Sequence, residues 1–177
     1  MMHRVWFGIL AAALTIAAAQ PADSVSLLRL LSGSEVTIGL DDQDEPRLEG
    51  GPATPLEPGE MDMLLSRLRD HPDAFGPKSA PLHTDQALPL IIPERIRFRF
   101  IPLNGGSQSV LVIENGLQRS FMYKARIGRG TRSMVTDVCQ VVPSLRGIEH
   151  WPYPIDWIEI SDIHVVAWNE GDRPRCE

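Results

Sequence analysis

The stretch Arg95-Ile96-Arg97-Phe98-Arg99-Phe100 alternates a guanidinium side chain with a large apolar side chain. A period of two residues is typical of a β-strand, because successive side chains of a strand point to opposite faces of the sheet. The pattern therefore predicts a strand with a buried face, made of Ile96, Phe98 and Phe100, and an exposed basic face, made of Arg95, Arg97 and Arg99.

Further short segments of strand character lie on both sides of this stretch, separated by turn residues. Asn115-Gly116 is the dipeptide best suited to a tight hairpin, and the strand after it places Lys124 and Arg126 opposite the apolar face Phe121, Tyr123, Ala125 and Ile127. The other expected strands are residues 35–40, 110–113, 133–142, 155–160 and 163–167, whereas residues 25–31 fit a helix or a strand. This pattern favours a mainly β fold, an antiparallel β-sandwich of immunoglobulin-like type or a small barrel.

One helix interrupts a proline-rich part of the chain. Nine prolines lie between Pro46 and Pro93, so this segment is expected to be mostly irregular. Within it, residues 60–70 carry apolar residues at helical spacing and predict one short amphipathic helix that ends at His71-Pro72, with its apolar face formed by Met61, Leu64, Leu65 and Leu68.

The N-terminus has the pattern of a secretory signal peptide. A short basic start is followed by an apolar run and by the small residues Ala17-Ala18-Ala19 before Gln20. The apolar run is short for a membrane-spanning helix. We therefore expect residues 1–19 to be removed and residues 20–177 to be a single domain, exported to the periplasm or secreted, with no transmembrane helix. Within it, residues 20–93 form the proline-rich, acidic part and residues 94–177 the β-rich part.

The two cysteines, Cys139 and Cys176, are predicted to form a disulfide. Export places both thiols in an oxidising compartment, where pairing is the ordinary outcome. The bond would fasten the end of the chain to the strand expected around Cys139.

Charge is divided along the chain, although the net charge is only -6. Eight acidic residues and one arginine lie between Asp41 and Asp62, whereas eight basic and two acidic residues lie between Glu94 and Arg132. If the basic strands pair, the sequence predicts a basic surface for phosphate or sulfate groups of envelope lipid or polysaccharide, formed by Arg95, Arg97, Arg99, Lys124 and Arg126. Alternatively, the acidic segment covers this face, or the bases are solvated. Nucleic acid is a poor partner for an acidic, exported chain.

Aromatic residues gather in the segment His150-Trp151-Pro152-Tyr153-Pro154 and at Trp157. Exposed rings form stacking platforms for sugars, so His150, Trp151, Tyr153 and Trp157 are a candidate carbohydrate site. The alternative is that these rings pack against the prolines and complete the core.

No motif of a known chemistry is present. The chain lacks a serine-hydrolase elbow and the spacings of histidine that hold zinc, so neither a catalytic residue nor a metal or other cofactor is predicted. Asp137, Glu149 and His150 are the best available acid/base set for a hydrolase of envelope polymers. The leading expectation is a non-enzymatic, exported β-sandwich that has a binding or structural role in the cell envelope; a carbohydrate-binding module and the hydrolase are the alternatives.

Overall fold

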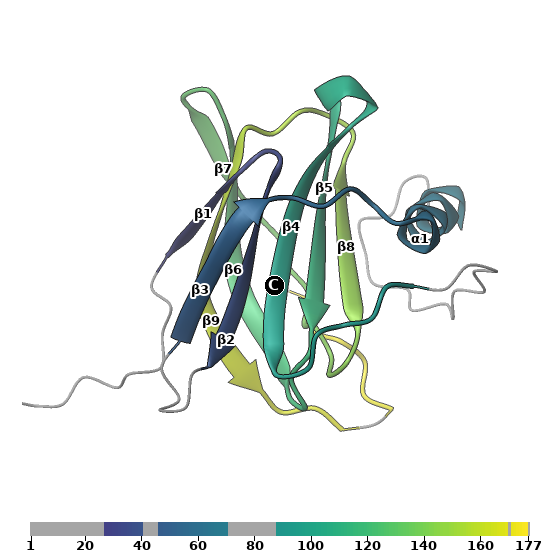
Figure 1. Cartoon of the computed structure of the whole chain (residues 1–177), viewed down its shortest axis with the longest axis vertical. Helices are drawn as coiled ribbons and strands as arrows, with labels where there is room; N and C mark the ends of the chain where they lie inside the picture. Colours follow the sequence, from purple (N-terminus) through teal and green to yellow (C-terminus); the bar gives the residue numbers. More distant parts are fainter. Residues whose placement is uncertain (1–26, 41–45, 71–87, 170, 177) are drawn as a thin grey trace, which may run out of the picture.

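The computed structural model describes residues 27–40, 46–70, 88–169 and 171–176, and shows two antiparallel sheets packed face to face (Figure 1). One sheet has the strand order β1-β9-β6-β7, with bounds Leu28–Leu31, Trp157–Val166, Ser120–Arg129 and Arg132–Thr136. The other has the order β3-β2-β4-β5-β8, with bounds Pro46–Pro52, Ser34–Leu40, Arg95–Leu103, Gln108–Asn115 and Arg146–Trp151. One α-helix, α1 (Pro58–Asp70), and the 3-10 turn η1 (Asn104–Gly106) complete the elements of the described residues. The predicted mainly β sandwich with one short helix is confirmed.

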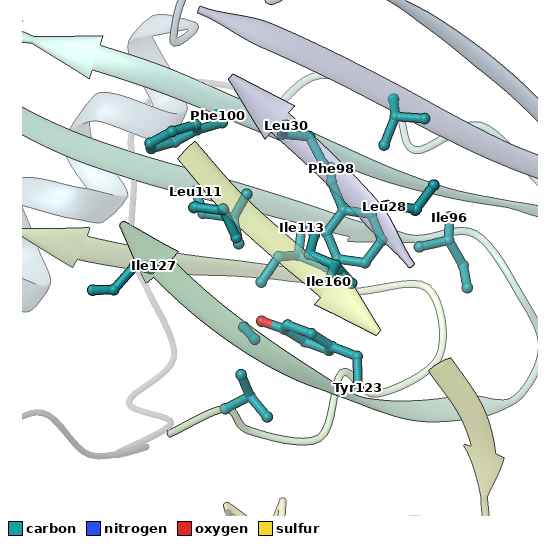
Figure 2. Close-up of a cluster of buried hydrophobic side chains, with 14 of the residues drawn as sticks. Leu28, Leu30, Ile96, Phe98, Phe100, Leu111, Ile113, Tyr123, Ile127 and Ile160 are labelled. Atoms are coloured by element: carbon teal, nitrogen blue, oxygen red, sulfur yellow. The ribbon is translucent and has the colours of Figure 1, made fainter. Parts of the chain in front are cut away.

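Strand β4 contributes its apolar face to the main core between the two sheets. Ile96, Phe98 and Phe100 are buried, as the alternation predicts. Phe98 meets Tyr123 of the opposite sheet edge to face, with ring centroids 5.5 Å apart (Figure 2). Such packing of aromatic rings adds to the stabilisation that comes from burying their surface.

Strand β6 supplies the facing side of this core. Phe121, Tyr123, Ala125 and Ile127 are buried and Lys124 and Arg126 are exposed, as predicted. The alternation does not extend to the start of the strand, where Ser120 and Met122 are buried as well. The hydroxyl of Tyr123 makes no hydrogen bond within the described part of the chain. Burial raises the pKa of this phenol well above its ordinary value, and the charge of Glu149 adds to the effect.

Helix α1 packs on the outer face of the five-stranded sheet (Figure 1). Met63 and Leu64 form a second apolar cluster there with sheet residues Ile101, Val110, Val112 and Ile148. The helix lies where the sequence predicts it, but its buried face differs. Leu65 and Leu68 are exposed, and the fully buried Glu60 lies on the packed side instead.

Asn115-Gly116 does not form the predicted hairpin, because β5 and β6 belong to different sheets. The buried side chain of Asn115 donates to the backbone carbonyls of Arg119, Val141 and Val142, which fixes the crossing between the sheets. A Cβ on Gly116 would lie 1.9 Å from the carbonyl oxygen of Ile92, so the close approach of two backbones is what requires glycine here.

Ser161-Asp162 does not separate two strands either. Strand β9 continues through it, and the register with β6 shifts between Met122 and Lys124. Asp162 has a φ of 52°, and the residues that suggested a turn form a β-bulge within one strand.

Two strands form where none is predicted. Strand β3 lies at the start of the proline-rich segment, with prolines at both of its ends and at the edge of its sheet, where a missing N–H is tolerated. Strand β8 lies beside β5. Residues 71–87 of the proline-rich segment and the predicted signal peptide lie outside the described residues.

The predicted disulfide between Cys139 and Cys176 is present, with the two Cα atoms 4.0 Å apart. Cys139 lies beyond the end of β7 and not inside a strand; it pairs with Cys176 in an isolated antiparallel bridge. The backbone N–H of Gln140 also donates to the carbonyl of Arg175 at 2.7 Å, so a backbone hydrogen bond and the disulfide both hold the C-terminal tail on this segment.

Candidate functional site

The five bases of the predicted basic face do not form one surface. Arg95, Arg97 and Arg99 lie on β4, in the five-stranded sheet, whereas Lys124 and Arg126 lie on β6, in the four-stranded sheet. Because these two sheets pack face to face and β4 does not pair with β6, the two groups of bases point away from each other on opposite sides of the sandwich.

Arg99 is not exposed, contrary to the alternation-based prediction. Only 2% of its surface is accessible, because α1 and the segment before it cover this end of the strand. Its guanidinium contacts the Glu60 carboxylate of α1 and lies 3.3 Å from Glu114 of β5. A charge is retained in a protein interior only when it is paired in this way.

Arg146 of β8 completes a buried charged cluster with Arg99, Glu60 and Glu114. Its Nε lies 3.0 Å from Glu60 Oε1, and its Nη2 lies 3.1 Å from Glu114 Oε1. Two positive and two negative charges therefore meet beneath α1 and cancel. Of this cluster only Arg99 belongs to the site predicted from the sequence. Glu114, at the end of the apolar run Val110–Ile113, is the sequence signal for a paired buried charge.

The remaining arginines of β4 are also paired with carboxylates. Arg97 Nη2 donates to both carboxylate oxygens of Glu35 at 2.9 Å, and Arg95 Nη1 lies 3.1 Å from Glu49 Oε2. Burial alone would raise the pKa of Glu35, but the hydrogen bonds from the Thr54 amide and from Arg97 outweigh it and lower that pKa. Carboxylates thus neutralise the β4 face. Glu49 and Glu60 come from the acidic segment of the alternative interpretation, whereas Glu35 and Glu114 lie outside that segment.

A group of three exposed bases lies on the hairpin formed by β6 and β7. Arg126, Arg129 and Arg132, here called the basic hairpin, are all exposed, and none of them forms an ion pair within the described residues. Arg126 Nη2 donates to Ser133 Oγ at 2.8 Å, which draws its guanidinium across β7. Lys124, in contrast, lies 2.7 Å from Asp162 and lowers the pKa of that carboxyl. The hairpin extends beyond the main body of the sandwich (Figure 1).

The aromatic residues do not gather into one platform. Trp151 is buried in the main core, and His150 contacts Gln108 at 3.2 Å, with its pKa lowered by burial. Tyr153 is exposed beyond β8, whereas Trp157 lies on β9 in the other sheet.

The Trp157 ring is held in a specific local arrangement. The guanidinium of Arg29 stacks over it at 4.2 Å, and a Cβ on the opposite Gly128 would lie 2.0 Å from ring atoms. Glycine is required at this position because the indole rests directly on its backbone. One face of the ring therefore packs on the sheet and the other on an arginine.

The acid/base set proposed for a hydrolase does not converge. Glu149 and His150 are neighbours on β8, so their side chains point to opposite faces of the sheet, and Asp137 follows β7 of the other sheet. Among the described residues, no three His, Cys, Asp or Glu side chains are grouped so that they can hold a metal ion.

Comparison with known protein families, curated proteins and solved structures found no match to this chain. Within the described ranges, no helix is long and apolar enough to span a bilayer.

Proposed function

We propose that this chain is an exported, non-enzymatic β-sandwich module of the cell envelope that binds phosphate or sulfate groups of envelope lipid or polysaccharide through the basic hairpin. The observation that supports this proposal is the contrast between the two groups of arginines. Those of β4 are neutralised by Glu35, Glu49 and the buried charged cluster, whereas Arg126, Arg129 and Arg132 keep exposed guanidinium groups.

The guanidinium group suits this ligand class because its planar fork donates two parallel hydrogen bonds to a phosphate or sulfate. Arg129 and Arg132 are directly opposite each other at the end of the hairpin, and Arg126 lies further along β6. By the register of the hairpin, Arg126 projects from one face and Arg129 and Arg132 from the other, so both faces of the hairpin carry positive charge on a chain whose net charge is negative.

Reversal of charge in the basic hairpin tests the proposal. We expect Arg126→Glu together with Arg129→Glu to abolish binding to vesicles of phosphatidylglycerol in phosphatidylcholine, to a sulfated polysaccharide, or to both, as measured by co-sedimentation and by affinity chromatography. The two probes distinguish a lipid source of the anion from a polysaccharide source. Binding by the unaltered protein should weaken as salt rises, because exposed charges are screened over about 8 Å at physiological ionic strength.

The matched control is Arg119→Glu together with Arg173→Glu, which changes the net charge equally at exposed positions outside the hairpin. This variant should bind nearly as well as the unaltered protein. Equal loss in both double variants would show that only net charge matters, and unchanged binding in the hairpin variant would refute the proposal.

A further inference from the structure

Strand β7 has a free edge. It is the last strand of the four-stranded sheet, pairs only with β6 among the described residues, and is exposed along most of its length. Met134 and Val135 are 58% and 67% exposed, although the edge strand of a soluble protein is usually protected by charges or a covering loop.

The outward backbone groups of β7 can be assigned from the hairpin register. Arg129 and Arg132 flank a two-residue loop and therefore form a hydrogen-bonded backbone pair. Because such pairs alternate along an antiparallel ladder, the backbone groups of Met134 and Thr136 also form hydrogen bonds with β6. The alternation leaves the N–H and C=O groups of Ser133 and Val135 pointing away from the sheet, where an added strand can pair with them.

The same edge already holds an extended segment further along the chain. Beyond β7, Cys139 forms an antiparallel bridge with Cys176, and Gln140 N donates to the carbonyl of Arg175. An added strand that pairs antiparallel with β7 would lie on the same edge as this tail and run in the same direction.

We infer that β7 binds an extended, acidic segment of a partner protein by addition of a β-strand. Charge complementarity defines the segment. A residue opposite Ser133 meets the Arg126 guanidinium, which is held 2.8 Å from Ser133 Oγ, and a residue opposite Arg132 meets that side chain on the other face. Residues opposite Val135 and Met134 contact apolar side chains. In antiparallel order the partner therefore carries two apolar residues followed by two acidic ones.

This inference uses the arginines of the proposed function but adds the backbone edge, so the two can fail separately. The probe is the peptide Thr-Val-Val-Glu-Glu-Thr with a fluorescent label, and binding is followed by anisotropy. We expect Val135→Pro to weaken peptide binding about tenfold, because it removes one outward N–H that the hairpin does not use. Val135→Thr keeps that N–H and should bind the peptide nearly as well as the unaltered protein.

Two further measurements keep the test independent of any effect of proline on folding. A peptide methylated on alternate backbone nitrogens should bind the unaltered protein at least about tenfold more weakly, since it cannot complete the ladder. Replacing both glutamates of the peptide by lysine should abolish binding. If neither Val135→Pro nor N-methylation of the peptide weakens peptide binding, strand addition is wrong. Binding of anionic vesicles or polysaccharide, which should be equal for Val135→Pro and the unaltered protein, tests the proposed function separately.

Discussion

At the scale of single residues, burial of Arg99 shows how tertiary partners override a surface pattern. An arginine on the solvent face of an alternating strand is ordinarily exposed. Here Glu60 and Glu114 contact its guanidinium, and Arg146 shares the same two carboxylates. The cluster holds α1 on the sheet through charge as well as through Met63 and Leu64.

Glu60→Gln tests the contribution of this cluster to stability. Removing one charge from a buried, paired group leaves the opposite charge uncompensated, so we expect the free energy of unfolding to fall by about 3 kcal/mol. Glu57→Gln, on an exposed residue one turn before, is the control and should change it by less than about 0.5 kcal/mol. Urea unfolding measures both values. Similar small effects in the two variants would mean that the cluster contributes little.

At the scale of elements, helix α1 forms where its periodicity predicts but presents a different face to the sheet. The predicted stripe includes Leu65 and Leu68, which are exposed. The observed face includes Glu60, whose carboxylate contacts two buried arginines, and Met63 and Leu64, which pack on the sheet. The rotation of the helix about its axis thus accompanies an ionic contact as well as apolar packing, and a hydrophobic pattern contains no information on the ionic contact.

Paired truncations distinguish the two faces of α1. We expect Met63→Ala to cost about 2 to 5 kcal/mol, since Met63 belongs only to the observed face and its truncation empties space in the cluster between helix and sheet. Leu65→Ala truncates a residue that belongs only to the predicted face and is 48% exposed, so it should cost clearly less. Thermal unfolding of both variants gives the comparison. The reverse order would place the predicted face, and not the observed one, against the sheet.

At the scale of the whole molecule, the C-terminal tail is tied to the sandwich by a long-range covalent link. The Cys139–Cys176 disulfide spans 37 residues and encloses β8 and β9, which belong to different sheets. Closing such a loop restricts the unfolded chain, which is the main source of stabilisation in the loop-entropy model.

Removing this link should lower the stability of the entire sandwich. We expect Cys139→Ser together with Cys176→Ser to reduce the free energy of unfolding by about 3 to 4 kcal/mol. Reduction of the unaltered protein should have a similar effect, and the double variant should no longer respond to reductant. If reduction leaves denaturant unfolding of the unaltered protein unchanged, the link does not stabilise the sandwich.

Local patterns sufficed for those features that depend on a residue and its near neighbours. The alternation in β4 and β6 predicted the apolar face that enters the core, because one face of each strand must be buried there, but it did not predict the burial of Met122. The helix, the sandwich class and the pairing of the only two cysteines were predictable for similar reasons. A local turn signal at Asn115-Gly116 was less informative, since a turn does not specify whether the chain returns to the same sheet.

The sequence by itself determined the two-faced strands, the position of α1 and the disulfide, because periodicity and cysteine number act within a segment or allow a single pairing. Only the tertiary structure decided which bases remain exposed. Arg99 and Arg126 both alternate with apolar neighbours, yet Arg99 is enclosed by carboxylates from α1 and β5 while Arg126 lies across an edge strand. The difference arises from contacts between residues distant in the chain, since burial of a charge depends on which partners the fold brings to it.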